Sequence, residues 1–135
     1  MKVYQGSIKV ETKKLNDVVR ITDKIQAIVD ESKIKKGIVF ANSLHNTAAV
    51  TIQEDDPTIF KDTFDLFERI LPLKGKYEHA EEGSANVAAH QKQNLLGNSV
   101  SIPITDGKLV LGTWQDIFIG ILQTKTERSY CHYIR

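Results

Sequence analysis

The sequence feature that most constrains the fold is the dipeptide Asp106-Gly107, which lies between two runs rich in apolar residues. Asp-Gly favours the two-residue turn that joins antiparallel strands, because both turn positions need a positive φ. The sequence therefore predicts a hairpin formed by strands 99–105 and 108–114. Two more runs, 117–123 and 129–134, have the composition of strands, so the last third of the chain is predicted to be a β-meander.

The first two-thirds of the chain mixes strand and helix patterns. Alternation of apolar and polar residues, or short apolar runs, predict four strands: 4–10, 18–21, 38–41 and 48–52. Helical spacing predicts three helices: one capped by Thr22 or Asp23 and ended by Gly37, one over 58–71 stopped by Pro72, and one capped by Ser84 and ended by Gly97. The predicted class is α+β, a single domain over 1–135 with sandwich-type sheets and two or three helices.

Charge and cysteine content exclude several classes of protein. The 135 residues carry 18 basic and 17 acidic side chains, and this balance argues against a nucleic-acid-binding protein. Cys131 is the only cysteine, so no intrachain disulfide can form and a cytoplasmic location is expected. No secretory signal and no apolar stretch of about 20 residues is present, so no membrane association is expected.

Three histidines lie in polar settings and are candidates for a metal site. His45, His79 and His90 could together hold a divalent metal and leave its other positions open to water or substrate. Their separations of 34 and 11 residues match no short zinc motif. The alternative for each is an ordinary surface or hydrogen-bonding histidine, which is also how His132 in the last predicted strand is interpreted.

Acidic residues follow His45 in the sequence. Glu54 and Asp62 could orient a ligating imidazole or bind a harder metal themselves. They could equally be solvated acids. Asp55 and Asp56 are interpreted as a turn that leads into Pro57.

Hydroxyl and lysine side chains could bind a phosphate. Thr47, Ser99 and Thr113 lie near predicted strand ends, and Lys92 follows His90 on the third helix, whose start at 84–86 offers free backbone N–H groups. The sequence contains no P-loop, dinucleotide fingerprint or nucleophile elbow. The only tryptophan, Trp114, either stacks on a planar ligand or is half-buried in the core, which is the commoner arrangement.

Taken together, these motifs resemble the YjbQ family, a family of small proteins associated with secondary thiamine-phosphate synthase activity. The matching residues run in the family's order along nearly the whole chain: His45-x-Thr47-Ala48-Ala49, Glu54-x-Asp56-Pro57, Asp62, Tyr77-x-His79, Asn86, His90-x-Lys92, Gly97-x-Ser99, Ile102-Pro103-Ile104, Gly107-x-Leu109 and Gly112-Thr113-Trp114-Gln115-x-Ile117. The most specific of them is the Gly-Thr-Trp-Gln block.

The resemblance implies a fold, an assembly and a reaction. The fold is α+β and assembles as a homotrimer, and the reaction joins a pyrimidine-methyl diphosphate to a thiazole phosphate and releases pyrophosphate. A divalent metal, zinc or magnesium, would be held by His45, His79 and His90 and would neutralise the leaving group. The other implied site residues are Thr47, Lys92, Ser99 and Arg128 for phosphate, and Glu54, Asp62, Trp114 and Gln115 in the catalytic pocket.

Two positions depart from the family's pattern. Gln53 stands where the family has asparagine. After the signature block, Ile121 and the run 125–130 replace a segment that is richer in acidic and basic residues. If the missing arginine and acid contribute to the pocket, activity or substrate would differ, so the alternative is a non-catalytic trimer that binds a metal or a phosphorylated metabolite.

Overall fold

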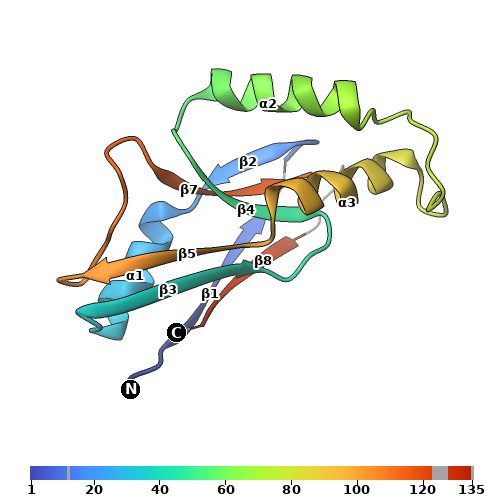
Figure 1. Cartoon of the computed structure of the whole chain (residues 1–135). Helices are drawn as coiled ribbons and strands as arrows, with labels where there is room; N and C mark the ends of the chain where they lie inside the picture. The colour runs from blue at the N-terminus through green and yellow to red at the C-terminus, as the bar shows by residue number, and fades with distance from the viewer. Residues whose placement is uncertain (12, 123–127, 135) are drawn as a thin grey trace.

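Two antiparallel sheets and three helices make up the computed structural model, which describes residues 1–11, 13–122 and 128–134 (Figure 1). The larger sheet has the strand order β1-β8-β3-β5-β6. Its strands are β1 (Gln5–Glu11), β8 (Arg128–Ile134), β3 (Lys36–Ser43), β5 (Ser99–Thr105) and β6 (Lys108–Leu109). The smaller sheet has the order β2-β7-β4, with β2 (Asp17–Arg20), β7 (Asp116–Ile121) and β4 (Ala48–Gln53). The α+β class is confirmed.

The predicted meander in the last third is wrong. β5 and β6 pair as a hairpin, but β7 leaves their sheet and pairs with β2 and β4. β8 returns to the larger sheet and lies between β1 and β3. These pairings join segments far apart in the sequence, so local patterning does not reveal them.

The hairpin turn itself is as predicted. Asp106 and Gly107 both have positive φ, 52° and 76°. The second strand is much shorter than expected, because β6 ends at Leu109. Residues 113–114 form a turn before β7, and Trp114 is 72% exposed, so of the two alternatives for this residue the half-buried core position is wrong.

The core lies between the two sheets and the helix α1 (Thr22–Ser32). Alternate residues of β1 point inward, and Ile8 and Val10 are buried while their neighbours are exposed. Ile25 and Val29 of α1 close the same cluster. β1 approaches α1 so closely that a Cβ on Gly6 would lie 2.9 Å from a side-chain methyl of Ile28.

The ends of α1 differ from the prediction. Ile21 is its N-cap residue, and Thr22 lies inside the helix, where its hydroxyl donates to Asp116 and does not cap the helix. Lys33 ends the helix in the left-handed conformation, with φ of 58°. Gly37 is therefore not the helix stop, and it lies within β3.

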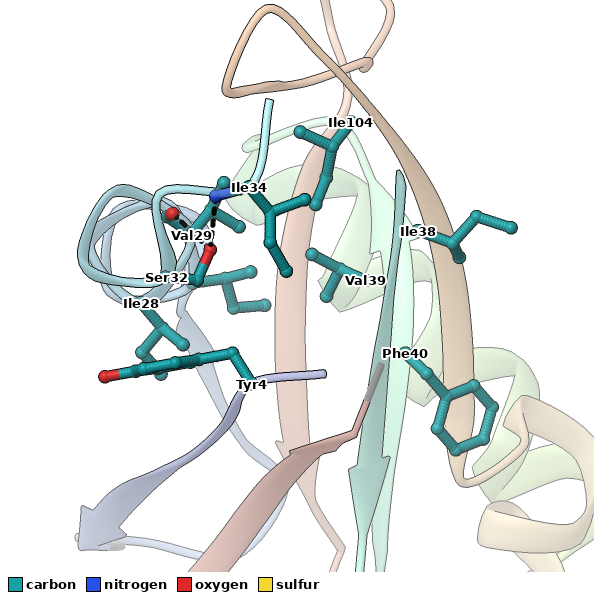
Figure 2. Close-up of a pocket in the computed structure, with 10 residues that line it drawn as sticks. Tyr4, Ile28, Val29, Ser32, Ile34, Ile38, Val39, Phe40 and Ile104 are labelled. Atoms are coloured by element: carbon teal, nitrogen blue, oxygen red, sulfur yellow. Dashed lines mark hydrogen bonds between the residues drawn. The ribbon is translucent and has the colours of Figure 1, made fainter. Parts of the chain in front are cut away.

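A small apolar cavity of about 30 Å³ remains between α1 and β3 (Figure 2). Figure 2 shows Ile34, Val39 and Ile104 pointing into this space. The backbone after the helix is fixed by Ser32, whose hydroxyl donates to the carbonyl of Val29 at 2.7 Å and accepts from the N–H of Ile34 at 3.1 Å. Side chains therefore nearly fill the space between α1 and this part of β3.

The other two helices cover the outer face of the smaller sheet (Figure 1). α2 (Pro57–Ile70) begins at Asp56, whose carboxylate accepts from the N–H of Thr58, and Phe67 is its only fully buried residue among those described. α3 (Ser84–Leu96) packs against β4 through Ala49 and Ala89 and ends at Gly97, as predicted. Within the described parts of the chain, no helix is long and apolar enough to cross a bilayer.

Candidate functional site

Two of the three candidate histidines lie side by side. The rings of His79 and His90 have centroids 5.8 Å apart and meet edge to face at 78°. His79 comes from the loop between α2 and α3 and is exposed, while His90 lies in the middle of α3 and is half-buried. Segments from two elements thus bring a pair of imidazoles to the protein surface.

The loop that carries His79 is fixed at both of its ends. Pro72 ends α2, and its carbonyl accepts both the N–H of Gly75 at 3.0 Å and the hydroxyl of Tyr77 at 2.8 Å. Burial and the nearby Glu68 carboxylate raise the pKa of Tyr77, which therefore stays a hydrogen-bond donor. The hydroxyl of Ser84 donates to the carbonyl of Leu73. It therefore joins the loop to the start of α3 and is not a helix cap.

Asn86 is the notable polar residue on the same helix. It lies one turn before His90, and residues four apart share a face of a helix. Only 4% of Asn86 is exposed, and its Oδ1 has no hydrogen-bond partner in the structure. Leaving a buried acceptor unsatisfied costs about 1–3 kcal/mol, so this position favours a ligand or side chain that donates to it.

His45 occupies the turn between β3 and β4, where it is half-buried and its N–H donates to the hydroxyl of Ser43 at 3.3 Å. Thr47, in the same turn, is buried, and its carbonyl accepts the N–H of Leu122. No three His, Cys, Asp or Glu side chains are grouped for metal binding in the part of the chain that the structure describes. His45 therefore does not join the pair within one chain.

The spacing of the His79–His90 pair suits a shared metal ion, but the number of ligands does not. A tetrahedral metal with bonds of about 2.0–2.1 Å sets two ligating rings about 5 Å apart, close to the observed separation. Structural and catalytic zinc sites use at least three protein ligands, and magnesium prefers oxygen. The pair alone does not fit either ion, and the three-histidine site stays a prediction.

The candidate phosphate ligands are dispersed. Only 1% of Lys92 is exposed, and its Nζ donates to Oδ1 of Asn16 at 3.3 Å, in the turn between β1 and β2. Residues two apart on a helix project from different sides, so Lys92 and His90 diverge. Ser99 is half-buried at the start of β5. Arg128 begins β8 opposite Glu11, and its side chain is outside what the structure describes, as is the run 123–127.

The remaining candidates lie at the other end of the smaller sheet. The register of β4 and β7 pairs Ala48 with Ile121 at one end and Gln53 with Asp116 at the other. Glu54 follows the second pair, and Trp114 and Gln115 precede it, whereas His45 precedes the first. Gln115 is exposed and closes its own turn, with Oε1 accepting from the N–H of Gly112 at 2.8 Å. Asp62 is exposed on α2. Within one chain these residues do not surround the histidine pair.

Sequence reasoning overlooked the residue after this turn, Asp116. Its carboxylate accepts from the hydroxyl of Thr22 at 2.7 Å and pairs with Arg20 at 2.8 Å. Thr22 in turn accepts the N–H of Ile117 at 2.8 Å. Burial would raise the pKa of Asp116, but the bonds from Arg20 and Thr22 outweigh it and lower the pKa. The only sequence signal for Asp116 was its position, as an acidic residue directly after the Gly-Thr-Trp-Gln block.

The fold defines the class of protein. A YjbQ-like protein of unknown function from Sulfolobus solfataricus P2 superposes with a TM-score of 0.91, at 32% identity over 98% of this chain and 96% of that one. A YjbQ/UPF0047 family protein from Clostridium acetobutylicum superposes with a TM-score of 0.85, at 32% identity over 96% and 97% of the two chains.

Sequence comparison identifies the family. The family model described as UPF0047 protein YjbQ-like matches residues 6–134. A UPF0047 protein from Methanocaldococcus jannaschii is 36% identical over 123 residues, 90% of this chain and 87% of the relative. The UPF0047 protein YjbQ of Escherichia coli O157:H7 is 34% identical over 102 residues, 74% of each chain. The chain belongs to the YjbQ-like UPF0047 family, as the Gly-Thr-Trp-Gln block predicted.

Proposed function

We propose that this protein is a transferase that joins a pyrimidine-methyl diphosphate to a thiazole phosphate, a thiamine-phosphate synthase activity. The observation that carries the proposal is the His79–His90 pair at the surface, with the buried, unsatisfied Asn86 one helical turn before His90. Imidazoles change protonation near neutral pH and donate to phosphate oxygens when protonated. Membership of the family supports the choice of reaction.

In this reaction the bond between the methylene carbon and the diphosphate oxygen breaks as the bond to the thiazole forms. Pyrophosphate leaves with the bonding electrons, so stabilising its charge lowers the barrier. His79 and His90 in their protonated forms would donate to the leaving oxygens. A bound divalent metal would add Lewis-acid neutralisation, but it needs ligands beyond this pair.

We also propose that the protein assembles as a homotrimer through the outer face of the larger sheet. Ile38 and Phe40 project from the side of β3 opposite the core and are 58% and 38% exposed (Figure 2). Pro103, opposite Ile38 in the register, extends the apolar surface. This surface favours self-association with or without catalysis, so a non-catalytic trimer that binds phosphorylated metabolites is the second candidate function.

Rescue of a thiamine-requiring host that lacks its own synthase tests the proposal. Wild type should restore growth, and His79→Gln and His90→Gln should each lower pyrophosphate release by purified protein by about 10²–10⁴-fold. Gln91→Ala, an exposed change on the same helix, is the control and should rescue fully. Equal rescue by wild type and His90→Gln would rule out the site.

Metal analysis tests the three-histidine prediction separately. If His45, His79 and His90 bind one ion, His45→Ala and His90→Ala should each remove zinc from the purified protein. Stoichiometric metal persisting in His45→Ala would exclude His45 as an essential ligand.

Light scattering tests the proposed assembly. The variant Ile38→Asp should shift a trimer to a monomer.

A further inference from the structure

A second hollow lies away from the histidine pair, between α2 and β2. The cleft has a volume of about 430 Å³, within the range of sites that hold small molecules. Its walls come from the β1–β2 turn, β2, the start of α2 and β7. The lining residues are Lys14, Asn16, Asp17, Val18, Arg20, Asp55, Pro57, Phe60, Lys61, Phe64 and Phe118.

The floor of the cleft is aromatic. The ring of Phe60 on α2 meets that of Phe118 on β7 edge to face, with centroids 4.8 Å apart. Phe64 lies one turn further along α2 and is half-buried. A smaller apolar cavity of about 50 Å³ shares Phe60, Phe64 and Val18 and continues beneath the helix to Leu96. Such a floor suits a planar ring, which packs against these faces and edges.

The basic side chains on the rim of the cleft differ in how firmly they are already paired with acids. Arg20 is engaged by Asp23 at 2.7 Å and by Asp116 at 2.8 Å. Lys61 pairs with Asp65, but both side chains are more than 60% exposed, so that pair is weak and exchangeable. Lys14 has no ion-pair partner among the described residues. Lys14 on the β1–β2 turn is therefore free to meet an anion, and Lys61 on α2 can do so by giving up its exposed pair with Asp65.

Asn16 supplies an oriented donor. It sits in the left-handed conformation, with φ of 53°, and its Oδ1 accepts from the buried Lys92. An ammonium group can only donate, so it fixes which end of the amide faces Lys92. The Nδ2 group is left to offer its hydrogens to the cleft. Lys92 is thus a positioning residue, which explains why a lysine is buried here.

Two carboxylates on the rim limit the ligand's charge. Asp17 accepts the N–H of Lys13 at 2.9 Å, and Asp55 lies at the start of α2. Both would repel a polyanion. From the floor, the donors and these acids, we infer that the cleft binds a small molecule with one planar aromatic ring and one anionic group. The ring lies on Phe60, Phe64 and Phe118, and the anionic group accepts from Asn16 and Lys14.

Calorimetry on the full chain tests this inference with simple probes. Phenyl phosphate and 3-phenylpropanoate are aryl anions, benzyl alcohol has the ring without charge, and inorganic phosphate has charge without the ring. Each aryl anion should bind at least about tenfold more tightly than both fragments. If only the phosphate ester binds, the anionic group is a phosphate, and if both bind, any single anion suffices. No aryl-anion binding, or equal affinity for the fragments, would overturn the inference.

Asn16→Asp is the sharpest variant. It keeps the shape, the tolerance of positive φ and the acceptor for Lys92, but it replaces the donor with a negative charge. Aryl-anion affinity should fall by more than about tenfold, while the exposed control Asn94→Asp leaves it unchanged. Unchanged affinity in Asn16→Asp, with the same melting temperature, would overturn the assignment.

Two further variants do not depend on the folding of Asn16→Asp. Lys14→Met removes one cation and should weaken aryl anions but not benzyl alcohol. Lys92→Met frees the Asn16 amide to rotate and should produce the same selective loss. If Lys14→Met and Lys92→Met weakened the binding of benzyl alcohol as much as that of the aryl anions, both lysines would have only a structural role, which would contradict the inference. The outcome does not depend on the proposed synthase reaction, because no lining residue belongs to the histidine site.

Discussion

The two sides of the smaller sheet are covered in opposite ways. Between the two sheets and α1 the buried side chains form the main core, and the cavity between α1 and β3 measures only about 30 Å³, whereas a cleft of about 430 Å³ remains open beneath α2. α1 buries aliphatic side chains directly on the sheets, while α2 rests on the half-buried rings of Phe60 and Phe64. The closed side supplies stability, and the open side is available to a ligand.

The largest expected effect comes from the closed side. Ile119 is fully buried, and Ile119→Ala should lower the free energy of unfolding by about 2–5 kcal/mol. Phe60→Ala on the open side should cost only about 1–2 kcal/mol, because the ring is already half-exposed. Denaturant unfolding of both variants measures the difference. Equal losses would show that α2 seals its side of the sheet as tightly as α1 does.

The next effect concerns the junction that fixes β7 to α1. Asp116→Ala removes the acceptor for Arg20 and Thr22 and should cost about 1–3 kcal/mol. The lowered pKa of Asp116 means that its contribution is present above the unfolded value of about 3.9 and is lost as pH falls through the folded pKa. Chemical unfolding between pH 7 and pH 2 should therefore show the gap to wild type closing in acid. Asp62→Ala, an exposed acid on α2, should show little effect at any pH.

The smallest effect tests the buried cation behind the cleft. Burial lowers the pKa of Lys92, and Glu68 offsets this only in part, so the folded state holds this proton less tightly than the unfolded state. Wild type should therefore gain stability as pH rises from the folded pKa toward the unfolded value of about 10.4. Lys92→Met should be more stable by about 1 kcal/mol at neutral pH, and its advantage should shrink at alkaline pH. A constant difference across the pH range would show that Lys92 is not desolvated.

Much of the local structure could be predicted from the sequence. Asp106-Gly107 identified a hairpin because few residues tolerate positive φ, Ser99–Thr105 has the bounds that alternation indicated, and the helix Ser84–Leu96 ends before Gly97 as predicted. The end of α1 at Lys33 was missed because a lysine rarely adopts the left-handed conformation that glycine favours. The division of the strands into two sheets depends on long-range pairing, which local patterns do not encode.

The candidate site was predicted less completely than the fold. The sequence indicated His79 and His90 as functional residues, and the structure brings them together. It did not indicate that Lys92 would turn toward Asn16, since a buried lysine violates the usual preference for exposure. The cleft was missed entirely, because its lining joins four segments that have no common motif.

A titration followed by backbone amide NMR tests the contrast between the two sides most directly. Saturating 3-phenylpropanoate should shift the amides of Asn16, Phe60 and Phe118 and leave those of Ile25, Ile34 and Val39, around the small cavity, in place. Shifts around α1 and β3 with none beneath α2, or no shifts at all, would contradict the account that one side is closed for stability and the other open for binding.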